Sequence, residues 1–208
     1  MRVSIRISLA VEDDLSEAVI RRLLKDRPIP YDVLEVHKRG GAGYLRKRTK
    51  AFNNLARLNP VLLLTDLDRC PCPPGLLEEW LPHPRHRNFL LRVAVREVEA
   101  WLLADDDSMG RFLGLRRALR IPDPEGLPDP KAELLKLGNT SPIRDVRDGL
   151  VRLEHAGVLR QGPAYNSIMS AYVYQSWQAG HAVAKCRSLR RMVAALQRLE
   201  SDLEGGRH

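Results

Sequence analysis

Acidic residues cluster at three places where an apolar stretch of the sequence gives way to a polar one. They are Glu12, Asp13 and Asp14, then Asp66 and Asp68, and finally Glu97 and Glu99. Carboxylates are hard oxygen ligands, which Mg²⁺ binds together with water and phosphate oxygens. A carboxylate beside such an ion can also carry a proton to or from an attacking or leaving oxygen. The pattern predicts metal-assisted chemistry on phosphodiester or phosphoryl groups.

Asp66 and Asp68 carry the strongest of these signals. They follow the aliphatic run Val61-Leu62-Leu63-Leu64 directly, with Thr65 and Leu67 between. In extended backbone, residues two apart point the same way, so these two carboxylates could share one cation. Capping of the next helix is the favoured interpretation of Asp13 and Asp14, because acidic side chains stabilise a helix N-terminus.

Alternating strands and helices must position these acids. A period of two in residues 3–9 predicts a first strand, and the uninterrupted aliphatic run of the third strand is typical of a parallel sheet covered on both faces. Further strands are predicted at 31–37 and 88–95, and helices at 15–24, 40–58 and 76–81. Such alternation favours an α/β fold with a mostly parallel, open sheet. Ligands gather outside the carboxyl ends of such strands, where all three acidic groups would lie.

The second half of the chain has a different pattern. A helix is predicted over 109–120, followed by a proline-rich stretch at 121–130 and further helical patterns. The last predicted helix, 182–203, carries an apolar stripe along one face. We therefore predict an α/β domain over residues 1–107 and a mainly helical C-terminal extension over 108–208.

These motifs together resemble the Toprim domain of topoisomerases, primases and OLD-family nucleases. The resemblance rests on Val11-Glu12 after the first strand and on Thr65-Asp66-Leu67-Asp68 after the third. The segment from Arg96 to Asp105 is similar to small Toprim-like proteins of the DUF4276 type. So, more loosely, are Gly162-Pro163-Ala164-Tyr165-Asn166, Trp177 and Ser188-Leu189-Arg190-Arg191.

The resemblance implies a Mg²⁺-dependent or Mn²⁺-dependent nuclease. Glu12, Asp66 and Asp68 would be the catalytic residues and metal ligands, with Glu97 and Glu99 as further candidate ligands. Glu97 and Glu99 could equally be solvated residues in the first turn of a helix. Similar proteins are often paired with an ATPase and suspected of roles in phage defence, so an ATPase is an implied partner.

Two alternatives use the same residues. Toprim proteins usually have a glycine after the glutamate, where this chain has Asp13, so a catalytically degenerate subunit that binds nucleic acid or an ATPase stays open. The string Val11-Glu12-Asp13-Asp14 also resembles the start of a response-regulator receiver domain, with Asp66 as the phosphoacceptor. A receiver predicts Ser or Thr at the end of strand four, where this chain has Arg96-Glu97.

A basic segment follows the second predicted strand. Glycines at 40, 41 and 43 precede or begin a helix, where free N–H groups favour an anion. The candidate residues for binding a nucleic-acid backbone are Arg39, Arg46, Lys47, Arg48 and Lys50. The net charge of +8 also suits a polyanionic partner, with DNA favoured. The three cysteines form no disulfide framework, and no apolar run approaches the length of a membrane span, which together predict a cytoplasmic protein without a membrane partner. An oligomer is compatible with the sequence.

Overall fold

The computed structural model describes residues 4–81 and 83–205, and the chain folds into two compact units. Unit 1 comprises Met1–Val95 and Ser188–His208, and unit 2 comprises Arg96–Arg187. The boundary predicted between residues 107 and 108 therefore differs from this division. The difference arises because the chain leaves unit 1 once, at the end of the fourth strand, and its last helix returns to it.

Unit 1 is built on a sheet of four parallel strands. These are β1 (Ile5–Ala10), β2 (Tyr31–His37), β3 (Val61–Asp66) and β4 (Phe89–Ala94), in the order β2-β1-β3-β4. The predicted α/β class with a parallel open sheet is confirmed. The predicted start of the first strand at Val3 lies outside the described residues.

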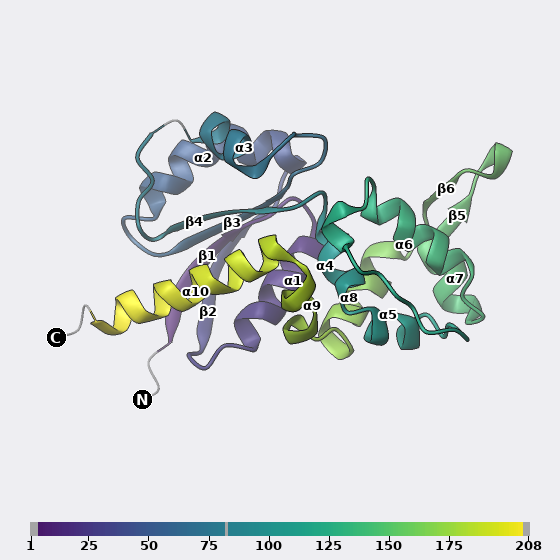
Figure 1. Cartoon of the computed structure of the whole chain (residues 1–208). Coiled ribbons are helices and arrows are strands. Elements are labelled where there is room, and N and C mark those ends of the chain that lie inside the picture. The colour runs from purple at the N-terminus through teal and green to yellow at the C-terminus, as the bar shows by residue number, and fades with distance from the viewer. Residues whose placement is uncertain (1–3, 82, 206–208) are drawn as a thin grey trace. The chain divides into compact units, whose positions relative to one another are not determined.

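Helices cover both faces of this sheet. Figure 1 shows α2 (Gly41–Leu55) and α3 (Pro73–Trp80) on one face, and α1 (Asp14–Lys25) and α10 (Arg187–Gly205) on the other. The core beneath α2 and α3 includes Phe52, Trp80 and alternate residues of β3 and β4. All of residues 61–64 are fully buried, as a strand covered on both faces requires.

A buried ion pair ties α10 to the rest of unit 1. Arg27 donates from Nε and Nη2 to the two carboxylate oxygens of Glu200 over 2.8 and 2.7 Å. The hydroxyl of Tyr31 donates to Glu200 Oε1 over 2.9 Å. The bidentate geometry fixes the orientation of α10 against the α1–β2 connection, in addition to the packing of its buried apolar face.

Unit 2 is mainly helical and contains a short hairpin. Its α-helices are α4 (Val98–Ala104), α5 (Asp106–Phe112), α6 (Pro130–Asn139), α7 (Arg144–Leu150), α8 (Tyr165–Gln175) and α9 (Ala179–Lys185). Two 3-10 turns, η1 (Pro124–Gly126) and η2 (His155–Gly157), lie between them. The strands β5 (Val151–Leu153) and β6 (Leu159–Gln161) pair antiparallel. Neither unit contains, within its described residues, a helix long and apolar enough to cross a membrane.

Two expectations for the second half were wrong, and one element was missed. The helix predicted over 109–120 begins at Asp106 and ends at Phe112, and Gly114 then takes a positive φ of 66°. The helix predicted over 182–203 is two helices, because Cys186 is extended (φ −108°, ψ 111°) between α9 and α10. The β5–β6 hairpin was not predicted, since strands of three residues are too short to show a period.

Candidate functional site

The strand order places Glu12 and Asp66 at the topological switch point of the sheet. From β1 the chain moves outward to β2 through α1, then crosses back through α2 to β3 on the other side of β1. The connections on either side of the β1–β3 boundary thus lie on opposite faces, and ligands of open α/β sheets gather at the carboxyl ends of the strands at such a point. Glu12 follows β1 and Asp66 ends β3, so both lie at this switch point.

Glu12 is anchored to the end of β3 through one carboxylate oxygen. Its Oε1 accepts a hydrogen bond from the Thr65 hydroxyl over 2.5 Å and another from the main-chain N–H of Asp66 over 2.9 Å. Thr65 is itself buried, at 1% exposure. Oε2 accepts no hydrogen bond within the described residues. The structure therefore holds one oxygen of Glu12 in place, while the other has no hydrogen-bond donor among the described residues.

The electrostatic surroundings of Glu12 disfavour its charge. Burial raises the pKa of the Glu12 carboxyl, and the nearby carboxylates of Asp68 and Asp13 raise it further, against the hydrogen bonds from Thr65 and Asp66. No basic side chain in residues 4–81 and 83–205 forms an ion pair with Glu12. A cation beside these acids would remove both the repulsion and part of the desolvation cost.

Asp68 reaches this region by a route that differs from the expected one. Strand β3 ends at Asp66, and Asp68 adopts a left-handed conformation with φ 49°, which Asp tolerates better than most residues. The argument that Asp66 and Asp68 point the same way in extended backbone therefore fails. The turn, continued by the hydrogen bond from Cys70 N to Leu67 O, brings Asp68 close enough to Glu12 to raise its pKa.

The fit of a divalent ion to this region can be tested on the donor atoms. Within the described ranges, no group of three or more His, Cys, Asp or Glu side chains is arranged to hold a metal ion. Mg²⁺ usually takes only one or two protein carboxylates and completes its shell with water and substrate phosphates. Glu12 and its neighbours Asp66 and Asp68 supply hard oxygens of this kind, so the donor set fits such a water-rich ion.

Glu97 and Glu99 belong to unit 2, where a lysine and a tyrosine balance them. The ammonium of Lys131 lies 3.8 Å from Glu97 Oε1 and 3.4 Å from Glu99 Oε1, and the Lys131 main-chain N–H donates to Glu97 Oε2 over 2.9 Å. The Tyr165 hydroxyl donates to buried Glu99 over 2.8 Å. Burial, and then the charge of Glu99, raise the pKa of Glu97. These interactions give both carboxylates a structural role in unit 2.

The predicted nucleic-acid-binding residues are all on the surface of unit 1. The predicted residues, all of which have exposed side chains, are Arg39, Arg46, Lys47, Arg48 and Lys50. Gly40 and Gly41 take positive φ values of 69° and 59° where α2 begins. Of this set, Arg46 forms an ion pair with Glu79 at 2.6 Å. Neighbouring Lys38 instead bonds Asp14 and Glu17, which ties the loop after β2 to α1.

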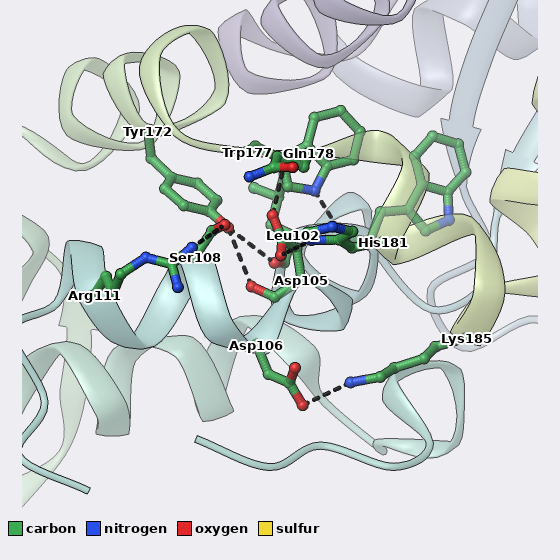
Figure 2. A network of polar contacts seen from close by, with 11 residues as sticks. Leu102, Asp105, Asp106, Ser108, Arg111, Tyr172, Trp177, Gln178, His181 and Lys185 are labelled. Atoms are coloured by element: carbon green, nitrogen blue, oxygen red, sulfur yellow. Dashed lines mark hydrogen bonds and ion pairs between the residues drawn. The ribbon is translucent and has the colours of Figure 1, made fainter. Parts of the chain in front are cut away.

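A polar network inside unit 2 was not predicted from the sequence. Figure 2 shows buried Asp105 accepting the Gln178 N–H over 2.8 Å and facing His181 Nδ1 at 3.1 Å. The Tyr172 hydroxyl lies 3.4 Å from the Leu102 carbonyl oxygen. A carboxylate that orients a histidine can help that histidine act as a general base towards a nucleophile. However, no hydroxyl or thiol in the described part of the chain bonds His181. The network instead stabilises α9 at its N-terminus.

Residues of α4 and of the segment around α8 meet in unit 2. Tyr165 bonds Glu99, and the Trp177 indole N–H donates to the Trp101 carbonyl over 3.2 Å. Both tryptophans are fully buried, so these residues form the core that joins α4 to α8 and its C-terminal end. Comparison of the chain with protein-family models, curated proteins and solved structures finds no match.

Proposed function

We propose that unit 1 binds Mg²⁺ or Mn²⁺ between Glu12, Asp66 and Asp68 and hydrolyses phosphodiester bonds in nucleic acid. The observation that carries this proposal is the Glu12 carboxylate at the switch point of the sheet. It is anchored through one oxygen, lacks a basic partner among the described residues and is repelled by Asp68. Acids are kept in such an arrangement at a cost to stability, which a bound cation would offset.

In this mechanism the residues of the chain would have the following roles. Hydrolysis adds water across a P–O bond and yields a phosphate monoester and a hydroxyl. A divalent ion held by Glu12, Asp66 and Asp68 would supply charge stabilisation at the phosphoryl oxygens and a water of lowered pKa. Glu12 Oε2 is the oxygen that can accept the proton of the attacking water, while Thr65 and Asp66 hold Oε1 in place.

Nuclease assays test the proposal directly. Single- and double-stranded DNA and RNA would be incubated with the full chain in Mg²⁺, Mn²⁺ or EDTA, with and without a candidate partner ATPase. We expect cleavage that requires the ion and that falls at least about 100-fold in Asp68→Ala, because loss of a ligand or electrostatic stabiliser typically costs this much. Glu78→Gln removes an exposed acid of α3 and is the matched control, with an unchanged rate.

Two results would contradict the mechanism: cleavage that persists in EDTA, or a full rate in Asp68→Ala with unchanged metal dependence. A chain that binds nucleic acid but cleaves none of the substrates in any ion would instead support a second candidate function. In that case the protein is a non-catalytic subunit that binds nucleic acid or an ATPase. The observation that favours this candidate is that the described residues hold no three-ligand metal group.

A receiver-like phosphoacceptor is less well supported. The order β2-β1-β3-β4 is compatible with the first four strands of such a domain, with Asp66 at the end of β3. However, β4 is an edge of the described sheet, so the fifth strand that carries the receiver lysine does not pair with it in that part of the chain. Acetyl phosphate should leave no acyl phosphate on Asp66, and mass spectrometry would detect one.

A further inference from the structure

Arg92 of unit 1 lies within electrostatic reach of three other arginines, and none of the four has an acidic partner among the described residues. Arg92 lies in the middle of β4, where it pairs with Leu64. Its neighbours are Arg85, in the loop before β4, and Arg191 and Arg198 on α10. Residues 191 and 198 are seven apart, which places them two turns apart on one face of the helix. Figure 1 shows α10 running across one face of the sheet.

Arg92 differs from an ordinary surface arginine in its burial. The Nε atom is buried and forms no hydrogen bond within the described residues. Burial lowers the pKa of the Arg92 guanidinium to about 10, and the charges of Arg85, Arg198 and Arg191 contribute to this lowering in that order. The fold therefore holds a partly dehydrated cation among like charges.

Such an arrangement needs an explanation, because a buried charge without a partner is costly and one donor is left unsatisfied. The carboxylates of α10 that the structure describes do not supply an acidic partner for these arginines. Glu200 is taken by Arg27 and Tyr31, and Asp202, four residues after Arg198, forms no ion pair with it. An anion from solution would pair with the guanidinium groups and offset their mutual repulsion. Guanidinium forks match the oxygens of phosphate in a bidentate manner, and several of them suit its full charge.

We propose that Arg92, with Arg85, Arg191 and Arg198, forms a binding site for a phosphate group. This site shares no residue with the proposed cation site and does not depend on the nuclease proposal. The phosphate could come from a free phosphate or from the backbone of a nucleic acid, and the chemistry of recognition is the same.

Phosphate binding to the full chain in EDTA tests this site without any divalent ion. Calorimetry or thermal unfolding would compare inorganic phosphate with chloride at equal ionic strength. We expect saturable binding of phosphate, with an affinity that falls at least about tenfold in Arg92→Gln. The reason is that a hydrogen bond to a charged group typically contributes at least about a tenfold factor to an equilibrium constant. The double variant Arg191→Gln/Arg198→Gln changes only exposed side chains, so it keeps the test decisive if Arg92→Gln does not fold.

Arg87→Gln is the matched control, because Arg87 is exposed in the same loop as Arg85 but is not among the charges that act on Arg92. It should bind phosphate as the unmodified chain does.

A short single-stranded oligodeoxynucleotide without terminal phosphates distinguishes the two sources of the phosphate group. If the oligonucleotide competes with phosphate and this competition is lost in the double variant, the site binds a nucleic-acid backbone. If phosphate binds and the oligonucleotide does not compete, the site binds free phosphate. Equal effects of phosphate and chloride, or undiminished phosphate binding in the double variant, would overturn the proposal.

Discussion

The main-chain N–H of Asp66 donates to Glu12 Oε1 over 2.9 Å, which joins the residue that ends β3 to the one that follows β1. The bond uses the donor that would otherwise continue the strand ladder, so it depends on main-chain geometry and not on the Asp66 side chain. The Thr65 hydroxyl adds a second bond to the same oxygen. The position of Glu12 is thus set by the fold before any ligand arrives.

Glu12→Gln should stabilise the protein in EDTA at neutral and alkaline pH. The glutamine oxygen can still accept both hydrogen bonds, and the buried charge is removed. Burial raises the pKa of Glu12 above its ordinary value of 4.5, so the folded chain holds this proton more tightly than the unfolded chain. That contribution to stability is complete below the unfolded-state pKa and is lost as the pH rises through the folded-state pKa. Thermal unfolding should show the variant melting higher at pH 8 and level with the unmodified chain near pH 4.

The control for this prediction is Glu78→Gln, which replaces an exposed acid of unit 1 and should leave the melting temperature unchanged at both pH values. A lower melting temperature of Glu12→Gln at pH 8 would mean that the carboxylate is stabilising and already compensated. The electrostatic basis of the proposed cation site would then be lost.

Replacing the five exposed basic residues of the β2–α2 segment should weaken nucleic-acid binding for all sequences alike. The residues changed to Gln are Arg39, Arg46, Lys47, Arg48 and Lys50. For each phosphate that the variant no longer neutralises, the slope of log affinity against log salt should fall by roughly 0.7–0.9. Fluorescence anisotropy with labelled DNA at several salt concentrations measures this slope.

A control set for that experiment lies in unit 2, where Arg116, Arg117 and Arg120 are changed to Gln in the same way. Loss of affinity in the control set with no change of slope in the first set would show that the β2–α2 segment is solvated surface. Arg46 should contribute least of the five, because its ion pair with Glu79 must break before it binds phosphate.

Glu200→Ala should destabilise unit 1 by about 3–5 kcal/mol, because it leaves a largely buried arginine without its partner. Arg27 and Glu200 have side-chain exposures of only 14% and 7%, and Tyr31 would lose its bond as well. Chemical denaturation measures the loss. Glu204→Ala, at an exposed position of the same helix, should change the stability by less than about 0.5 kcal/mol. Recovery of most of the stability in Arg27→Met/Glu200→Leu would identify the unpaired charge as the cause, and equal effects of Glu200→Ala and Glu204→Ala would refute it.

Gly162→Ala should destabilise unit 2 by about 1–3 kcal/mol through overpacking. A Cβ atom at this position would lie 2.4 Å from the Gly149 carbonyl oxygen and 2.7 Å from the Val151 nitrogen, both main-chain atoms that cannot rotate away. Gly180→Ala is the matched change, since the space around Gly180 in α9 is open and Ala favours a helix by up to about 1 kcal/mol. Equal denaturation midpoints for the two variants would contradict the packing argument.

The parts of the fold that the sequence predicts well are those with local periodicity. Strand β2 spans the predicted residues 31–37, and the buried run 61–64 lies inside β3. Glu12 and Asp66 could be placed at one edge because the parallel strands β1 and β3 end there, whereas Glu97 and Glu99 belong to unit 2. The conformation of Asp68 could not be predicted, since a left-handed residue in a turn leaves no periodic signal. The sequence also does not predict the pairing of Arg27 with Glu200, because the two residues are separated by 173 positions. The arginines around Arg92 could not be predicted either.

Unit 2 is inserted into unit 1, and the two ends of the insertion meet where the Val95 N–H donates to Ser188 Oγ over 3.2 Å. This nesting has a consequence during biosynthesis. All four strands leave the ribosome before α10, and translation of residues 96–187 takes roughly 5–20 s at ordinary elongation rates. Throughout that interval, the face of the nascent sheet that α10 will cover stays uncovered. Newly made chains therefore pass through a stage in which this apolar face is open to chaperones or to aggregation.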